Sequence, residues 1–389
     1  MRDKFFFQLD NRLHYGVGWS RELGDFVKSL GWRRVVLLVD EGVAAHSPYY
    51  SEVRPLLAAA VEDVVEFRLR GNEEPSYDYL DELAGKIRAL ATVDGIVAIG
   101  GGSALDTAKA LACLRTNPGP ALGYRGFDNV KTPPVPSICI PSTAGTGSEV
   151  TINAVFTDKT EGRKLGINGR YLNATYAVLD AEWTMSAPAS VAISSGMDAL
   201  VHTLESFMTG NANPLTRALN REAFRLLYTN LPSLVDAPND KNARQALLLG
   251  SYLAAAGLFN SGSGIAGALS YPIGVHFKVP HGIAGGIFIA SVVDFNVERG
   301  WHDYAELLDI VEPHPDWSAE RKAKRFAELM HALADKLGVP KTLEKWGITR
   351  ANLDHVVTLV APLQAAFNQN PVPFAADTDA RAMLARHTN

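Results

Sequence analysis

Two residues, Asp198 and His202, have the types and the spacing of metal ligands. They lie four positions apart in a mostly apolar stretch, Ser194 to Phe207, whose pattern predicts a helix. Side chains four apart share one face of a helix, so a carboxylate and an imidazole would converge from consecutive turns. Such a pair can hold a divalent metal ion once a third ligand arrives from elsewhere in the chain.

A glycine-rich turn, Gly100 to Ser103, follows the clearest strand pattern in the chain and precedes a helix pattern. Glycines there let backbone N–H groups approach a phosphate, and the helix N-terminus adds a partial positive charge. The same residues also suit a tight turn without a ligand. Because the spacing matches neither the G-x-G-x-x-G nor the G-x-x-x-x-G-K-S/T motif, the turn alone leaves both interpretations open.

Two further features could contact a nucleotide. The stretch from Thr143 to Ser148 combines hydroxyl residues with glycines, and it could line a nucleotide or form a flexible connection. Asp40 ends a strand pattern, where its carboxylate could bind an adenosine ribose and favour NAD over the 2′-phosphorylated form. An Asp at such a place is more often a helix cap.

The elements that would position these residues change along the chain. The first half alternates β-branched runs with amphipathic stretches, which is typical of an α/β layer structure. Strands are predicted over 35–39, 61–67, 95–99 and 137–140, with helices over 76–91 and 104–114. After about Pro188, helices are predicted over 191–208, 214–230, 243–259 and 321–337. We therefore expect an α/β domain over 1–186 and an all-α domain over 187–389.

Composition narrows the class of protein. Lys plus Arg number 37 against 42 for Asp plus Glu, a net charge of −5 that gives no sign of nucleic-acid binding. The two cysteines form no C-x-x-C pair, which disfavours a disulfide scaffold or a cysteine zinc site and fits a reducing, cytoplasmic setting. No apolar run reaches the length of about 18 residues that a membrane span needs, and the run at Phe5 to Phe7 is too short for a signal peptide.

Four motifs together carry a resemblance to a known family. They are Gly100 to Lys109, Pro141 to Val150, Gly196 to His202 and Pro280 to Gly282. In this order they resemble the iron-containing (group III) alcohol dehydrogenases, over roughly residues 7–337. The resemblance implies a dinucleotide-binding α/β domain followed by a helical, metal-binding catalytic domain, a fold that is also found in dehydroquinate synthase.

The resemblance also assigns residues to the cofactor NAD(H). Position by position, it implies that the glycine turn holds the pyrophosphate, that two threonines flank the cofactor, that a lysine approaches it and that an aspartate binds the ribose. These residues are Gly101, Gly102 and Ser103, Thr143 and Thr146, Lys164, and Asp40.

For the metal, the family uses one Asp and three His residues, of which Asp198, His202 and His281 match three. The remaining position, fourteen residues before His281, is Gly267. Three interpretations compete. Three protein ligands suffice, or His276 swings in as a replacement ligand, or the metal is lost. With a metal retained, the resemblance implies a divalent ion, with Fe(II) favoured over Zn(II).

With a metal in place, the expected chemistry is hydride transfer between an alcohol carbon and the nicotinamide, while the ion stabilises the developing charge on oxygen. A proton must then leave by a relay. Tyr271, at a position where many members carry a second histidine, and His276 could take part through water. Both could equally be packing residues of the pocket.

Substrate identity depends on finer similarity. The segments 124–128, 164–168 and 268–276 are similar to a subgroup that includes phosphonoacetaldehyde reductases of phosphonate biosynthesis. We expect a small alcohol or aldehyde, with phosphonoacetaldehyde as the narrower hypothesis. An anionic substrate would need a cationic partner, and the candidates are Arg125, Arg163, Arg170 and Lys278.

Two other classes of function stay open. One is an NAD-using lyase similar to dehydroquinate synthase, and the other is a non-catalytic assembly subunit with a decayed metal site. We further expect a homo-oligomer, in the form of a dimer, with no nucleic-acid or membrane partner.

Overall fold

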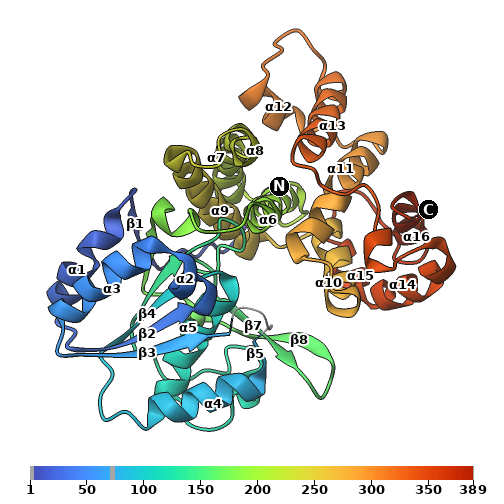
Figure 1. Ribbon diagram of the computed structural model, residues 1–389. Helices are drawn as coiled ribbons and strands as arrows, with labels where there is room; N and C mark the ends of the chain where they lie inside the picture. The colour runs from blue at the N-terminus through green and yellow to red at the C-terminus, as the bar shows by residue number, and fades with distance from the viewer. Residues whose placement is uncertain (1–3, 71–74, 389) are drawn as a thin grey trace. The chain divides into compact units, whose positions relative to one another are not determined.

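The structure is a computed structural model that describes residues 4–70 and 75–388 (Figure 1). Contacts divide it into two compact units, one of residues 9–188 and one of residues 189–388 together with residues 4–8. The sequence places a border between residues 186 and 187. The grouping of residues 4–8 with the second unit has no signal in the sequence, because these residues form no regular element.

A parallel sheet forms the centre of the first unit. Its strand order is β1-β9-β6-β4-β2-β3, and every neighbouring pair is parallel. The bounds are β1 Arg12–Tyr15, β2 Arg34–Asp40, β3 Asp63–Leu69, β4 Gly95–Gly100, β6 Ser137–Pro141 and β9 Tyr176–Leu179. All six residues of β4 are buried, as expected for a strand that is covered on both faces. The four strands predicted from apolar runs are confirmed.

Helices cover both faces of this sheet, as Figure 1 shows for the blue and cyan elements. Because side chains alternate along a strand, Val36 and Leu38 pack with α4 and α5, whereas Val35 and Leu37 pack with α1 and α3. The helices of this unit are α1 Leu23–Ser29, α2 Glu41–His46, α3 Pro48–Ala60, α4 Tyr77–Arg88 and α5 Gly102–Thr116, with short 3-10 helices η1 Trp19–Glu22, η2 Ala121–Tyr124, η3 Arg170–Leu172 and η4 Ala181–Thr184. The predicted α/β class is confirmed.

The strand order reverses direction next to β2. The chain passes from β2 to β3 on one side and then to β4 on the other. In such sheets ligands bind outside the carboxyl ends of the strands at the reversal point. Asp40 ends β2 and Gly100 ends β4, so the predicted nucleotide residues lie at this point.

A second, three-stranded sheet has the order β5-β8-β7. Its strands are β5 Gly126–Phe127, β7 Asn153–Asp158 and β8 Arg163–Asn168, and β7 and β8 form an antiparallel hairpin. The sequence reading places no strand here. Lys164 lies on β8 in register with Thr157.

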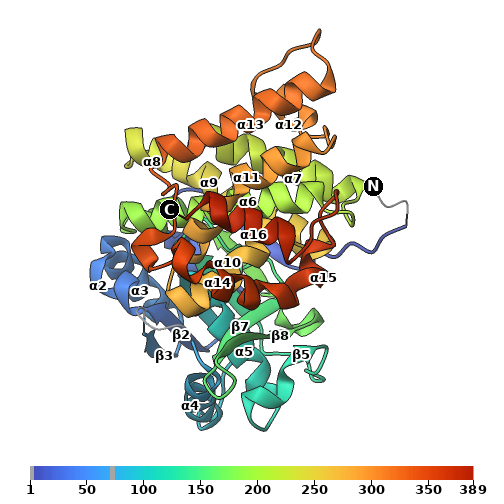
Figure 2. The same cartoon turned by 90° about the vertical axis from the view of Figure 1, so that its right-hand side faces the viewer.

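The second unit is helical (Figure 2). Its helices are α6 Ala189–Met208, α7 Pro214–Asn230, α8 Ser233–Asp236, α9 Lys241–Ser261, α10 Ile265–Phe277, α11 His281–Glu298, α12 Ala305–Val311, α13 Ala319–Lys336, α14 Leu353–Val360, α15 Gln364–Phe367 and α16 Thr378–Arg386, with η5 Glu344–Trp346, η6 Arg350–Asn352 and η7 Ala361–Leu363. The four helices predicted from periodicity are confirmed. Helix α10 was not predicted, and it contains Pro272.

Helix α6 is the central helix of this unit. It packs against α7, α9, α10 and α11, and it is buried from Gly196 to Met208 except at His202. A helix that is apolar around most of its circumference is stable only when other elements surround it. The polar residues that it carries in this setting therefore lie inside the unit.

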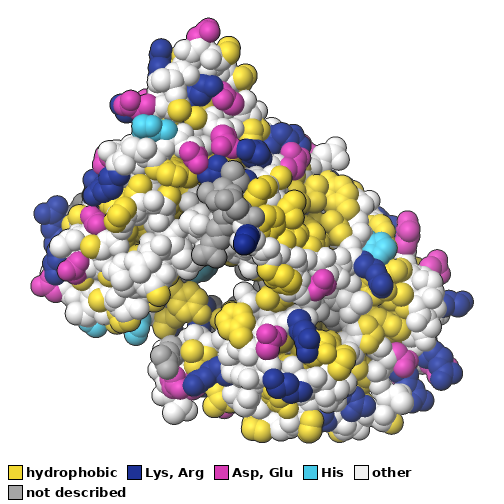
Figure 3. All heavy atoms as spheres, turned by 180° about the vertical axis from the view of Figure 1, so that it is seen from behind, with side chains coloured by type: hydrophobic (Ala, Val, Ile, Leu, Met, Phe, Trp, Pro, Cys, Tyr) yellow, Lys and Arg dark blue, Asp and Glu magenta, His cyan; other side chains and the backbone are white. Residues whose placement is uncertain are grey.

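Charged and apolar side chains are mixed on the surface. Figure 3 shows one face on which hydrophobic side chains form several patches with basic and acidic groups scattered among them. Every helix within residues 4–70 and 75–388 is too short or too polar to span a lipid bilayer.

Candidate metal and cofactor sites

Three side chains of the helical unit form one cluster. Asp198 and His202 come from consecutive turns of α6, and His281 is the first residue of α11. One ligand atom from each lies within 4.8 Å of the others. Asp198 Oδ1 is 3.5 Å from His202 Nε2 and 3.8 Å from His281 Nε2. These separations are short enough for a single ion to contact all three.

A glycine brings the third residue to the other two. A Cβ atom at Gly282 would lie only 1.9 Å from the carbonyl oxygen of Ser194. The backbone at the start of α11 therefore touches the backbone of α6 directly. Any side chain at position 282 would push the two helices apart. The Pro-His-Gly motif thus combines a ligand with the glycine that places it.

The donor set fits a divalent transition metal. A set of one carboxylate and two imidazoles, which leaves coordination positions on the ion open, is typical of Fe(II) enzymes and also suits zinc. Asp198 is 6 % exposed, and the His281 side chain is 42 % exposed, so the cluster opens on one side. His202 Nδ1 is buried and has no hydrogen-bond partner among the described residues.

Gly267, the position without the expected histidine, lies in the first turn of α10 beside a buried acid. Glu205, on α6, accepts hydrogen bonds from the N–H groups of Gly264 at 2.9 Å and Gly267 at 3.0 Å. Burial raises the pKa of Glu205, and the backbone N–H groups and nearby His202 act in the opposite direction. Glu205 was not among the predicted site residues, although an acid three residues after His202 in an apolar helix is a signal that could have identified it.

Both proton-relay candidates lie on α10. The Tyr271 ring centroid is 6.2 Å from that of His281, with the rings nearly perpendicular at 88°. His276 is exposed near the end of the helix and is not one of the three clustered ligands among the described residues. Its role as a replacement ligand stays a prediction.

The predicted pyrophosphate residues lie against the two threonines. A Cβ atom at Gly102 would lie 2.7 Å from Thr146 Oγ1, and one at Gly101 would lie 3.6 Å from Thr143 Oγ1. Helix α5 starts at Gly102 and has no side-chain cap, so the N–H groups of its first turn can serve an anion. Ser103, in that turn, is exposed.

Asp40 caps a helix and also faces a cavity. Its Oδ1 accepts the N–H groups of Gly42 at 2.8 Å and Val43 at 3.2 Å at the start of α2. Both bonds use the same oxygen, which leaves Oδ2 for a ribose, so the two interpretations are compatible. With Ser103, Asp40 lines a cavity of about 190 Å³, and the lining does not include Lys164.

A buried lysine ties this region together. Lys109 Nζ, on α5, donates to the carbonyl oxygens of Ser148, Thr151 and Asn153. Its neighbour Asp106 accepts the Ser148 hydroxyl and a backbone N–H group of β7. The segment that follows Thr146 is therefore held on α5. Lys109 belongs to a motif noted in the sequence, but its role there was overlooked.

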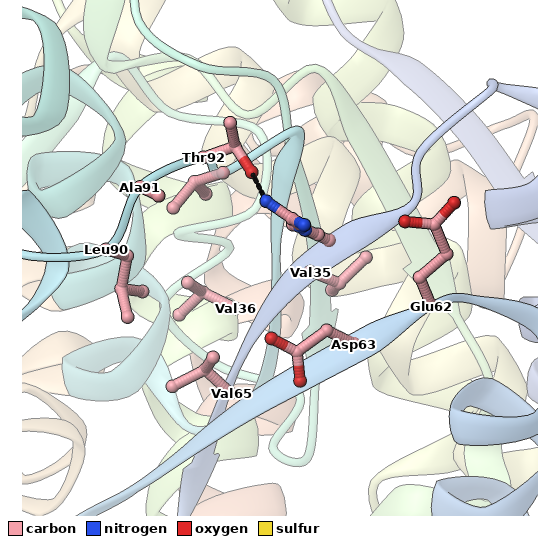
Figure 4. A pocket seen from close by; sticks show the side chains of 10 residues that line it. Val35, Val36, Glu62, Asp63, Val65, Leu90, Ala91 and Thr92 are labelled. Carbon is pink, nitrogen blue, oxygen red and sulfur yellow. Dashed lines mark hydrogen bonds between the residues drawn. The ribbon is translucent and has the colours of Figure 1, made fainter.

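A separate cavity of about 400 Å³ lies at the amino ends of β2 and β3 (Figure 4). Arg34 donates to Thr92 Oγ1 at 2.7 Å on its rim, and Glu62 and Asp63 also line it. This is the opposite end of the strands from Asp40. The cavity is therefore distinct from the predicted nucleotide residues.

The four cationic candidates have different surroundings. Arg125 pairs with Glu161 at 2.7 Å, and Arg170 stacks on the Tyr171 ring. Lys278 is exposed and ends α10 in a left-handed conformation, with φ 59°. Arg163 lies on β8, and its side chain is outside the described part of the chain.

Comparison with known families matched nearly the whole chain. A sequence model described as "Iron-containing alcohol dehydrogenase" matches residues 10–181. A second, described as "Fe-containing alcohol dehydrogenase family, C-terminal", matches residues 192–385.

Individual relatives agree with these matches. The chain is 32% identical to a sulfoacetaldehyde reductase of Bilophila wadsworthia, over 92% of this chain and 93% of the relative. It is 30% identical to an NAD-dependent methanol dehydrogenase of Bacillus methanolicus, over 87% and 88%. The solved structure of a 1,3-propanediol oxidoreductase superposes with a TM-score of 0.90 at 23% identity, covering 98% and 99%. That likeness supports the fold.

Proposed function

The chain belongs to the iron-containing alcohol dehydrogenase family and is an NAD-dependent oxidoreductase of alcohols or aldehydes, and we propose that it reduces a small anionic aldehyde with the help of a divalent metal ion. The observation that carries this proposal is the convergence of Asp198, His202 and His281 within 4.8 Å.

These three residues would hold the ion, with Fe(II) favoured over Zn(II) because of the donor set. A bound divalent ion acts as a Lewis acid that polarises a carbonyl oxygen. Since Gly267 offers no side chain, we favour the interpretation in which three protein ligands suffice. His276 as a fourth ligand is the alternative, and His276→Ala is its test.

Residues of the first unit would hold NAD(H). The first turn of α5, with Gly101, Gly102 and Ser103, would bind the pyrophosphate through backbone N–H groups. Thr143 and Thr146 lie against these glycines and would flank the cofactor. Asp40 would accept the ribose hydroxyls and repel a 2′-phosphate. Lys164, also assigned to the cofactor by resemblance, lies on β8 and would approach the cofactor from that strand.

Asp40 gives a direct test of cofactor choice. Asp40→Ala removes the charge that would oppose a 2′-phosphate, so we expect kcat/KM for NADPH relative to NADH to rise at least about tenfold, equivalent to about 1.4 kcal/mol. Because Asp40 also caps α2, Asp40→Asn is the matched variant that keeps a capping oxygen. An unchanged ratio in both variants would show that Asp40 does not bind the ribose.

Tyr271 is the better supported of the two proton-relay candidates because its ring lies against His281. Its hydroxyl would pass a proton between the substrate oxygen and water. Tyr271→Phe keeps the ring and removes the hydroxyl, and His276→Ala is the matched change on the same helix. A pH–rate profile that changes in neither variant would leave both residues without this role.

Support for an anionic substrate comes from the relative that is a sulfoacetaldehyde reductase. Sulfoacetaldehyde therefore replaces phosphonoacetaldehyde as the first substrate to test, since the relatives reported above do not include a phosphonate enzyme. Lys278, exposed and three residues before His281, is the cation of the helical unit that we propose to contact the anionic group.

The decisive experiment combines metal content with substrate choice. We expect the purified chain to contain iron or zinc and to oxidise NADH with sulfoacetaldehyde faster than with acetaldehyde. His202→Ala should lower both metal content and turnover, the latter by more than about 100-fold, because even residues behind the ligands are worth 10–100-fold. NADH oxidation that survives both a chelator and His202→Ala would contradict the proposal.

The lyase and the non-catalytic subunit gain no support. Both relatives reported above are dehydrogenases or reductases, and the three donor atoms of the metal cluster remain close enough for one ion. We also propose a homodimer, which is argued in the Discussion from the edge of the sheet.

A further inference from the structure

We propose that Glu205 is a positioning residue that fixes α10 against the ligand-bearing helix α6, in place of the fourth metal ligand that Gly267 cannot provide. This inference rests on the proposed function, because it concerns the surroundings of the same metal cluster. Glu205 itself would contact neither the ion nor the substrate.

The contacts of Glu205 identify it as a cap supplied by a neighbouring helix. Helix α10 begins after Gly264, which has no side chain to satisfy the N–H groups of the first turn. The carboxylate of Glu205 accepts two of them, one on each oxygen: Gly264 N to Oε2 and Gly267 N to Oε1. Oxygen acceptors at a helix N-terminus satisfy N–H groups that have no partner within the helix. Glu205 is completely buried, so water does not compete for it.

The two glycines are matched to this carboxylate. A Cβ atom at Gly264 would lie 3.0 Å from Oε1, and one at Gly267 would lie 2.8 Å from Oε2. A side chain at either position would therefore press on the carboxylate. The acid and the bare backbone opposite it form a close-fitting contact between α6 and α10.

This contact lies next to the metal cluster. Glu205 follows His202 by three residues on α6, close to one helical turn. On the other side, Tyr271 follows Gly267 by four residues on α10 and reaches the His281 ring. A histidine at position 267 would join α10 to α6 through a shared ion. Without it, the two hydrogen bonds of Glu205 still provide a polar link between these helices beside the cluster.

Loss of the Glu205 contact should affect the binding of the aldehyde and the metal more than the binding of NADH. Loosening α10 should move Tyr271, whose ring lies against His281, while the proposed cofactor residues lie in the other unit. We therefore expect the KM for the aldehyde to rise and the metal to leave faster. The KM for NADH should change little.

Glu205→Gln is the principal test, because the amide has the same shape but only one acceptor oxygen. In this variant we expect chelator-driven metal loss and the KM for the aldehyde each to increase about tenfold or more, the usual effect of changes just behind metal ligands. The KM for NADH should stay within about twofold. Hydrogen exchange of the α10 amides should accelerate in the metal-free chain as well.

Thr203→Val is the matched control. Thr203 is buried on the same helix, and its hydroxyl donates to the carbonyl oxygen of Ala199 within α6. Its replacement should lower the melting temperature without changing metal loss or the KM values. If Glu205→Gln does not fold, Gly267→Ala perturbs the same contact from the other side.

Two outcomes are separable. If Glu205→Gln or Gly267→Ala leaves metal loss, the KM for the aldehyde and α10 exchange as in the wild type, Glu205 has no positioning role. If instead the wild-type chain binds no metal, the proposed function fails. The exchange of α10 amides then still decides whether Glu205 holds this helix.

Discussion

At the scale of single residues, the metal site depends on position 267, where this chain has a glycine and the family pattern has a histidine. Asp198, His202 and His281 form a cluster that is close enough for one ion, and the first turn of α10 presents only backbone beside Glu205. A site with three protein ligands leaves more positions for water and substrate than a site with four. Looser metal binding is the accompanying expectation.

Gly267→His tests this directly. If position 267 lies beside the ion, as the family pattern implies, the imidazole should become a fourth ligand and slow metal loss to a chelator by at least about tenfold, equal to about 1.4 kcal/mol. Gly267→Ala is the control, since it adds the same Cβ atom 2.8 Å from Glu205 Oε2 without a donor. Equal metal loss in the two variants would contradict the expectation.

Part of the site could be predicted from residue types alone. Asp198 and His202 could be predicted as a pair of metal ligands from their spacing, because helical geometry fixes which side chains are neighbours. His281 lies 79 residues further on than His202 and could be assigned only through the resemblance. The partners of Glu205 and Lys109 include backbone groups, which leave no pattern in the sequence, so the roles of these two residues could not be predicted from residue types.

At the scale of elements, hydrogen bonds join α5 to the segment that follows Thr146. Lys109 and Asp106 bind the backbone of this segment, and Glu149 is fully buried beside them. Burial raises the pKa of Glu149 to about 7, and Asp106 adds to the increase while Lys109 opposes it. The segment therefore contains an acid that the folded state prefers in its protonated form.

Glu149 should make stability depend on pH. Its pKa in the unfolded chain is about 4.3, so its contribution to stability is fully present below that value and is lost as the pH rises through about 7. Glu149→Gln should remove up to about 4 kcal/mol of this loss. Melting temperatures of both proteins from pH 4 to pH 8 are the measurement, with Glu298→Gln on the surface as the charge-matched control. Parallel curves for wild type and Glu149→Gln would contradict it.

Helices and strands with a clear pattern of apolar residues could be predicted from the sequence, and the others could not. The apolar run at 95–99 and the helical period at 214–230 correspond to β4 and α7 almost residue for residue. The hairpin of β7 and β8 was overlooked because polar and apolar residue types do not alternate along β7, although its burial does, and because β8 includes Gly166. Helix α10 was overlooked because Gly264, Gly267 and Pro272 disfavour a helix locally, and its packing against α6 and α11 outweighs them.

At the scale of the whole molecule, the large sheet ends in an exposed strand. Strand β1 pairs with β9 on one side only among the described residues, and Leu13 and Tyr15 are exposed on it. An edge strand with apolar side chains is a template for pairing with another chain. A second copy of β1 related by a two-fold axis would satisfy both edges at once.

We expect a dimer with twice the chain mass of 42.0 kDa in light scattering after size exclusion. Leu13→Lys should shift this toward the monomer, because charged side chains on an edge strand oppose pairing. Leu122→Lys, which changes another exposed leucine of the same unit away from β1, is the control. A wild-type monomer, or a dimer unaffected by Leu13→Lys, would contradict pairing through β1.

The contact of Gly282 with Ser194 also limits how the sequence can diverge. Only a glycine allows α11 to touch α6 at this point, because a Cβ atom would lie 1.9 Å from a carbonyl oxygen. Descendants of this chain that lost their chemistry could replace Asp198, His202 or His281 and still fold. They would be expected to retain Gly282, so the glycine would outlast the ligand beside it and mark the former position of a metal site.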